Sequence, residues 1–190
     1  LVGILLAVII PLIGVVVVLK RLSMIGDALS HTSLAGVAVG LILGINPIIG
    51  AVVVCVIAAF SIEAIRKSLP KYAEISISII MSVGIGLASV LSGFIEDGAA
   101  FNSFLFGSIV AITDTEVILV VIVTIIVVAA FIMLYKELMF ITFDEQGAEL
   151  AGVPVKKINF LITLLTAITV SVAARSVGAL IVSSLMVIPV

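Results

Sequence analysis

The stretch Leu1–Leu19, LVGILLAVIIPLIGVVVVL, decides the fold class. It holds no charged residue, and Lys20 and Arg21 follow it directly. Because a helix rises about 1.5 Å per residue, a run of this length is long enough to cross roughly 30 Å of hydrocarbon. It lacks the basic leading region and the small-residue cleavage site of a signal peptide. The stretch therefore predicts a membrane-spanning helix.

The composition of the whole chain agrees with this interpretation. Of its 190 residues, 64% are hydrophobic and 11% are charged, and the mean hydropathy is +1.56. Soluble domains are about 45–50% apolar, so a soluble globular protein, a disordered chain and a disulfide scaffold are excluded. A net charge of −2 offers no basic stripe for nucleic acid. The chain begins at Leu1 rather than at methionine and ends at Val190 in an apolar run, so we expect residues 1–190 to be one transmembrane domain truncated at both ends.

Charged residues and turn signals divide the chain into about seven apolar runs. After the first run come runs at 22–45, 48–62, 75–94, 117–134 and 158–174, and a seventh begins near Val177. The runs are continuous, unlike the alternating strands of about ten residues that build membrane barrels. The sequence therefore predicts an all-α, polytopic transmembrane helical bundle.

The segment Gly98–Glu116 is the irregular part of this pattern. Its apolar portion, Ala99–Ile112, is short for a span and typical of a re-entrant segment. If it does not cross, alternation of the seven spans leaves only Arg175 on the outer side. All other basic residues then share one side, as the positive-inside rule requires: Lys20, Arg21, Arg66, Lys67, Lys71, Lys136, Lys156 and Lys157. We therefore expect a short re-entrant segment.

Asp27 and His31 are the polar residues that stand out within the spans. For a helix that begins near Leu22, His31 lies about 15 Å along the axis, with Asp27 one turn shallower on the same face. A carboxylate and an imidazole on one face form half of a site for zinc, manganese or iron(II). Three alternatives remain open: Asp27 as the N-cap of a helix that begins at Ala28, His31 as a packed core residue, and the pair as a proton relay.

A second polar feature, residues 143–153, is predicted to be a short cytoplasmic helix. Asp144 is suited to the N-cap, and Gly152 to the position just beyond the C-terminus. Ala148, Ala151 and Gly152 keep one side slim enough to enter a groove on another protein. The competing interpretation is a linker helix on the membrane surface, which its acidic residues disfavour.

Several segments resemble the membrane subunits of metal-ion ABC importers, the zinc/manganese/iron permease family. Leu19–Ala38, LKRLSMIGDALSHTSLAGVA, resembles that family's signature, and Phe104–Ser108, FLFGS, is similar to its segment before the fifth span. The spacing of Asp144, Ala148 and Gly152 resembles the family's coupling helix. Val177–Pro189, VGALIVSSLMVIP, is similar to its late pathway helix.

The resemblance implies an importer permease of the bacterial plasma membrane that works as a homodimer. It implies a cytoplasmic ATP-binding subunit and an extracytoplasmic metal-binding protein as partners. Asp27 and His31 would contact the transported metal, which the resemblance favours as zinc, with manganese or iron as alternatives. The coupling helix would meet the ATPase through Asp144, Glu145, Ala148, Glu149 and Gly152. No permanently bound cofactor and no nucleic acid are expected.

Two other classes compete with the importer. A proton- or ion-coupled secondary transporter would use Asp27 and His31 as a relay, but the two halves of the chain show no convincing repeat. An intramembrane metalloprotease would need H-E-x-x-H, whereas Thr32-Ser33-Leu34-Ala35 follows His31. The chain also lacks the G-x-x-x-x-G-K-[ST] phosphate loop, so we expect it to be a transport subunit, not an enzyme, with ATP hydrolysis on a separate polypeptide.

Overall fold

The computed structural model describes residues 2–20, 22–69, 72–95, 98–107 and 112–188. Every regular element in these ranges is an α-helix, which confirms the predicted all-α class. Some residues named in the sequence analysis lie outside the described residues: Leu1, Arg21, Lys71, Ser108, Pro189, Val190 and positions 108–111 of the predicted re-entrant segment. Six of the described helices are long and apolar enough to cross a membrane: α1 (Val2–Leu19), α2 (Ile25–Ile42), α3 (Pro47–Ser68), α4 (Ala73–Ser92), α6 (Asp114–Met133) and α9 (Val155–Val177).

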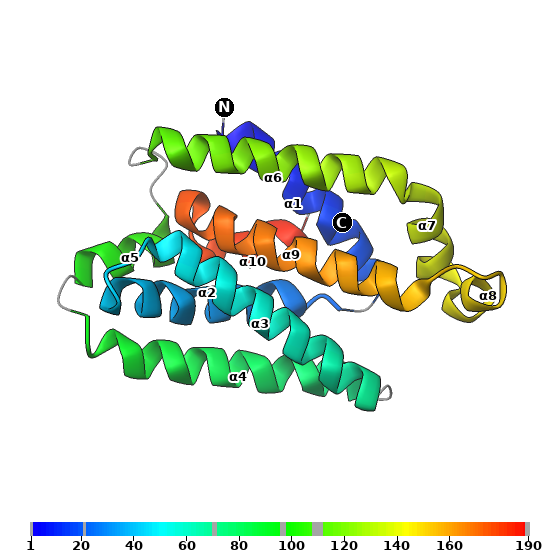
Figure 1. Ribbon diagram of the computed structural model, residues 1–190, viewed down its shortest axis with the longest axis horizontal. Coiled ribbons are helices and arrows are strands. Elements are labelled where there is room, and N and C mark those ends of the chain that lie inside the picture. The colour runs from blue at the N-terminus through cyan, green and yellow to red at the C-terminus, as the bar shows by residue number, and fades with distance from the viewer. Residues whose placement is uncertain (1, 21, 70–71, 96–97, 108–111, 189–190) are drawn as a thin grey trace.

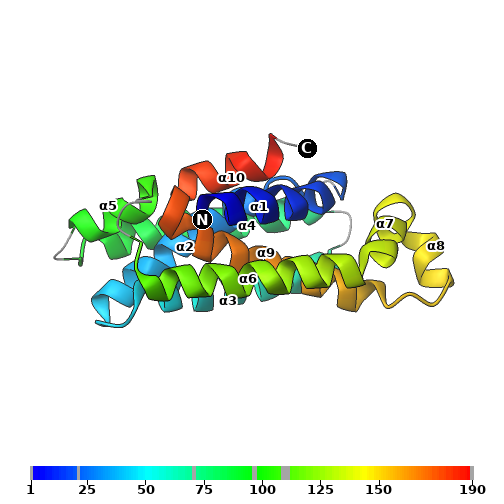
Figure 2. The same ribbon diagram turned by 90° about the horizontal axis from the view of Figure 1, so that it is seen from above.

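The remaining helices are short: α5 (Gly98–Phe106), α7 (Tyr135–Phe143), α8 (Glu145–Leu150) and α10 (Ala179–Val187). α5 lies at one end of the bundle and α7 and α8 lie at the other (Figures 1 and 2). With nine residues, α5 is about 14 Å long and too short to cross a membrane, in agreement with the predicted re-entrant segment. The sequence did not predict α7. The seventh predicted span corresponds to α10, which starts after a break at Gly178.

α2 and α9 form the centre of the bundle, and α4 and α6 lie at its periphery (Figure 1). The main apolar core joins α1, α2, α3, α6, α9 and α10, and α4 contributes Ile77 to it. α6 is buried along one side only, at Val120, Val123, Thr124 and Val127. The apolar residues on its outer side suit contact with lipid chains, because a spanning helix needs no polar surface within the bilayer.

Close approach of backbones holds α2 against α3. A Cβ atom built on Gly36 would lie 2.5 Å from the carbonyl oxygen of Gly50, and one built on Gly50 would lie 2.4 Å from that of Gly36. Side chains therefore do not fit at this crossing, which explains the small-residue spacing of Gly36 and Gly40 in physical terms. The pattern does not extend to every glycine, since Gly86 on α4 has open space at its Cβ position.

A second pair of glycines holds the end of α5. Gly107 and Gly178 both adopt positive φ angles, +75° and +97°. A Cβ atom on Gly107 would collide with the backbone of Val177, and one on Gly178 with that of Phe106. Because L-residues rarely adopt this backbone region, glycine serves here for both conformation and space. The C-terminus of α5 is thereby packed on the junction between α9 and α10.

Candidate functional site

Asp27 and His31 face each other on α2. His31 Nε2 lies 3.6 Å from Asp27 Oδ1, a separation longer than a hydrogen bond. α2 begins at Ile25 with Met24 as its N-cap, so Asp27 is the third helical residue. The alternative in which Asp27 caps a helix beginning at Ala28 is therefore wrong. His31 lies about 9 Å along the axis from the start of α2, whereas the sequence, with a helix that begins near Leu22, predicted about 15 Å.

This pair marks the open side of an otherwise enclosed helix. From Ala28 to Ala38, every residue of α2 except His31 is buried. The side chains of His31 and Asp27 are 26% and 43% exposed, respectively. The other sides of α2 pack against α3, α4, α5, α9 and α10. Because the rest of the chain leaves both side chains partly uncovered, a ligand can reach them, whereas it cannot reach a fully packed histidine.

The neighbouring polar groups of α2 are occupied by the helix itself. The hydroxyl of Ser30 donates to the carbonyl of Gly26 at 2.8 Å, and that of Thr32 donates to the carbonyl of Ala28 at 2.7 Å. Within the described residues, no group of three or more His, Cys, Asp and Glu side chains is close enough to hold a metal ion. One copy of the chain therefore offers two strong ligands at this position, an imidazole and a carboxylate.

The predicted cytoplasmic helix is present as α8, shorter than the 143–153 expected. Asp144 is its N-cap, and the carboxylate Oδ1 accepts a hydrogen bond of 2.8 Å from the amide of Gly147. Gly152, with φ +85°, follows Ala151, the C-cap. Both predicted ends are therefore confirmed. An acidic N-cap side chain and a left-handed glycine after the C-cap are the usual ways to satisfy the free backbone groups at helix ends.

Ala148 differs from its predicted orientation. It is 0% exposed and packs into an apolar cluster of α1, α7 and α9, where Val16, Leu138 and Ile158 are also buried. Its side chain therefore fixes α8 to the bundle instead of facing a partner. The outward surface of α8 is formed by exposed residues around Leu150, which is 90% exposed: Glu149, Ala151 and Gly152. Glu145 is exposed as well, but its carboxylate turns toward Asn159 of α9.

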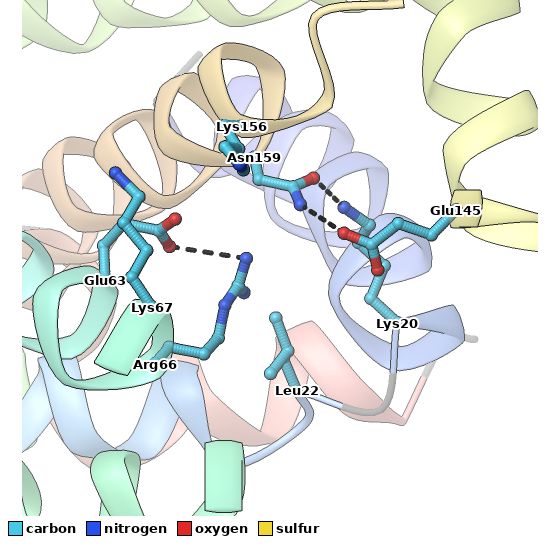
Figure 3. Close-up of a pocket in the computed structure, with 8 residues that line it drawn as sticks. All are labelled: Lys20, Leu22, Glu63, Arg66, Lys67, Glu145, Lys156 and Asn159. Atoms are coloured by element: carbon cyan, nitrogen blue, oxygen red, sulfur yellow. Dashed lines mark hydrogen bonds and ion pairs between the residues drawn. The ribbon is translucent and has the colours of Figure 1, made fainter. Parts of the chain in front are cut away.

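A polar cavity beside α8 is the feature that sequence reasoning missed (Figure 3). It has a volume of about 560 Å³. Its lining comes from the ends of α1, α3 and α9 and from α8: Lys20, Leu22, Glu63, Arg66, Lys67, Glu145, Lys156 and Asn159. Four of the basic residues that the positive-inside argument placed on one side are thus neighbours here. Asn159 lies one turn inside α9. Within the predicted spanning runs, its polar side chain was the only indication in the sequence of this cavity.

Burial of the Lys20 amine, at the end of α1, is the largest electrostatic effect in this cavity. The pKa of Lys20 is lowered from 10.5 to about 8, mainly because burial desolvates the amine, and the nearby Arg66 adds to this lowering. The carboxylates of Glu145 and Glu63 act in the opposite direction and offset part of that shift. Lys20 is therefore held in a polar but poorly hydrated position.

Arg175 organises the opposite end of the bundle. Its Nε lies 3.2 Å from Glu116 Oε1 on α6, and its Nη1 donates a hydrogen bond of 2.8 Å to Ser103 Oγ on α5. The guanidinium also lies 4.8 Å from the ring centroid of Phe104. A planar cation with several donors can bind all three groups at once. Arg175 therefore joins α9, α5 and α6, and it lies far from Lys20 and its basic neighbours, as predicted.

Comparisons with known proteins identify the family. The model of the ABC 3 transport family matches residues 1–190. A probable metal transport system membrane protein of Treponema pallidum is 32% identical, with 98% of this chain and 70% of the relative covered. The high-affinity zinc uptake system membrane protein ZnuB of Haemophilus influenzae is 34% identical (98% and 72% covered). The manganese transport system membrane protein MntC of Listeria monocytogenes is 33% identical (93% and 63% covered).

A solved structure agrees with the sequence comparison. PsaBC from Streptococcus pneumoniae, in complex with Fab, matches with a TM-score of 0.84 and 29% identity, and the match covers 99% of this chain and 68% of that one. The match extends over the whole bundle, including α5, α8 and α10. Together with the family model, it shows that this chain belongs to the ABC 3 transport family of membrane permeases.

Proposed function

We propose that this chain is the membrane-spanning subunit of an ATP-driven importer of divalent transition metal, with zinc as the favoured cargo and manganese or iron as alternatives. The observation that carries the proposal is the pairing of Asp27 with His31, where His31 is the one residue between Ala28 and Ala38 of α2 that is not buried. Related permeases are named for zinc and for manganese uptake. The bacteria in which they occur support a location in the bacterial plasma membrane.

The geometry of the pair suits a metal in transit. Zinc bonds to imidazole nitrogen and carboxylate oxygen at about 2.1 Å, so two ligands of a tetrahedral ion are about 3.4 Å apart. The observed separation of 3.6 Å lies close to that value. Two ligands alone bind weakly, and a second copy of the chain that faced the first across α2 would supply two more. This is the reason to propose a permease homodimer with Asp27 and His31 of both copies on the transport path.

The exposed surface of α8 supports a cytoplasmic ATP-binding subunit as partner. Leu150 projects from a six-residue helix whose opposite side is anchored by Ala148. An exposed apolar side chain on a capped, anchored helix is suited to a cleft on another protein. In this proposal Asp144 and Gly152 set the ends of α8 and Glu149 lies on its polar surface, while the Glu145 carboxylate turns to the polar cavity. An extracytoplasmic metal-binding protein would deliver the cargo at the α5 end.

The test is metal accumulation in cells that lack their own importer and express the full-length permease with its ATPase. Asp27→Ala and His31→Ala are compared with Ser33→Ala, which removes a buried hydroxyl that bonds only the carbonyl of Ser30 on the same helix. At matched membrane levels, we expect both site variants to lose accumulation of one metal and Ser33→Ala to keep it. Normal accumulation in both site variants would refute the proposed site.

Dependence on ATP separates the importer from a proton-coupled transporter. In proteoliposomes that hold the complete complex, uptake should stop when ATP is withdrawn and continue when the proton gradient is dissipated. The reverse pattern would favour Asp27 and His31 as a proton relay.

A further inference from the structure

A short chain of hydrogen bonds ties α8 to two spanning helices. Asn159 Nδ2 of α9 donates to Glu145 Oε1 of α8 at 2.9 Å. Asn159 Oδ1 accepts a hydrogen bond from Lys20 Nζ at the end of α1. Figure 3 shows both interactions along one wall of the polar cavity. The amide of Asn159, only 5% exposed, therefore connects the first residue of α8 with both α9 and α1.

The facing wall of the cavity belongs to α3. Glu63, 4% exposed, has its Oε2 3.4 Å from Arg66 Nη2 on the same helix. Among the described residues, no hydrogen bond or ion pair joins Glu63 or Arg66 to Lys20, Asn159 or Glu145. α8 is therefore fastened to α1 and α9 on one side of the cavity. α3 lies across the open volume at this level, although it packs directly on α9 elsewhere, as at the rings of Phe60 and Phe160, whose centroids are 4.9 Å apart.

α9 is suited to carry a displacement across the whole bundle. Its 23 residues form one helix about 35 Å long, with Asn159 near one end and Arg175 near the other. Arg175 binds the side chains of α5 and α6 at that far end. A shift of α8 that moved Asn159 would therefore also move the residues that hold α5, because a continuous hydrogen-bonded helix resists axial deformation.

We propose that Asn159 and Lys20 are positioning residues that transmit movement of α8 to α9 and α1, so that both helices shift against α3 across the polar cavity. This inference rests on the proposed function, in which α8 contacts an ATP-binding subunit. The apolar contact of Ala148 holds α8 in place but is not directional. The hydrogen bonds of Asn159 are directional, and their geometry fixes how α8 and α9 move together.

Exchanging the hydrogen-bonding roles of Asn159 and Glu145 gives a sharp test. In Asn159→Asp, the new carboxylate still accepts from Lys20 but repels Glu145. In the double variant Asn159→Asp with Glu145→Gln, the new amide can donate to the new carboxylate, and the total charge of the cavity is that of the original chain. Thr163→Val is the matched control, because its hydroxyl bonds only to the Asn159 carbonyl one turn back on α9.

The measurement uses the full-length permease with its ATPase and metal-binding protein in proteoliposomes. Zinc or manganese transported per ATP hydrolysed is determined for each variant, together with the amount of ATPase retained on purification. We expect Asn159→Asp to lower the ratio about tenfold, since hydrogen bonds to charged groups are strong enough for such a change. The double variant should recover most of the ratio, Thr163→Val should keep it, and all should retain the ATPase.

Each alternative result overturns a different claim. If Asn159→Asp keeps the ratio of Thr163→Val, or the double variant stays as low as the single one, the link through Asn159 is wrong and the proposed function stands. If Asn159→Asp and the double variant both lose the ATPase, Asn159 serves assembly, and the transmission role is refuted. If the original chain itself neither transports metal nor hydrolyses ATP in the complex, the proposed function fails.

Discussion

Gly36→Ala tests the packing of the helix that carries the candidate site. The added Cβ atom would lie 2.5 Å from the Gly50 carbonyl oxygen and 2.7 Å from the Cα of Ala51, and both are backbone atoms of α3. Ordinary contacts of a Cβ begin near 3.4 Å. α2 and α3 must therefore separate by about 1 Å at this crossing, because neither backbone can move aside independently of its helix.

The expected cost follows from this separation. Overpacking of a tight interface costs about 1–3 kcal/mol, and the better helix propensity of alanine offsets up to about 1 kcal/mol. A net loss of about 1–2 kcal/mol would lower the midpoint of thermal unfolding by about 2–8 °C for a chain of this size. Gly86→Ala is the control, since its Cβ meets no atom within 4 Å. It should be neutral or slightly stabilising.

Cys55 provides the assay. It is the only cysteine of this chain and is fully buried on α3, with Sγ 3.3 Å from the carbonyl oxygen of Leu29 on α2. A thiol-reactive fluorescent dye therefore labels it only when α2 and α3 separate. We expect labelling to begin at a lower temperature in Gly36→Ala than in the original chain. An onset equal to that of Gly86→Ala would refute the account of the α2–α3 contact.

Three further predictions concern residues outside the metal pair. Arg175→Met removes the ion pair with Glu116, so we expect the free energy of unfolding to fall by about 1.5–3 kcal/mol and the amides of α5 to exchange faster. Unchanged exchange in α5 would contradict the role of Arg175 in holding that helix. Asp144→Ala removes the N-cap of α8 and should cost about 1 kcal/mol of helix stability, so the Gly147 amide should exchange about fivefold faster. Exchange at the rate of the original chain would disprove the cap. Because the pKa of Lys20 is lowered to about 8 from 10.5, the unfolded chain binds the proton more tightly. The original chain should therefore gain stability relative to Lys20→Gln as the pH rises from 8 to 10.5, and thermal unfolding of both chains measures this gain. A stability difference that stays constant over this pH range would show that the pKa of Lys20 is not lowered.

The spanning helices follow from the sequence because lipid leaves the backbone few alternatives. Each apolar run became a helix, since unpaired backbone groups are too costly in hydrocarbon. The predicted helix ends were less accurate. α3 continues to Ser68, past Glu63 and Arg66, because these two charges pair with each other and line the polar cavity. α7 was missed because Tyr135–Phe143 carries charged residues at its start and lacks the length of a span.

Local spacing accounts for part of the candidate site. The four-residue interval between Asp27 and His31 predicts their proximity, which the structure bears out. The openness of that side of α2 depends on how five other helices pack, and no local pattern encodes it. The same holds for the cavity beside α8, where Lys20 and Asn159 meet although 139 residues separate them in the chain.

The most direct test of the central claim is pulsed electron paramagnetic resonance of Mn²⁺ bound to the purified full-length complex. His31 is the only histidine among residues 1–190, so within this part of the permease imidazole coupling to the metal has one source. We expect such coupling in the original protein, its loss in His31→Gln, and loss of bound Mn²⁺ when Asp27→Asn is added. Mn²⁺ that binds equally well in the double variant, or nitrogen coupling that persists in His31→Gln, would contradict the claim.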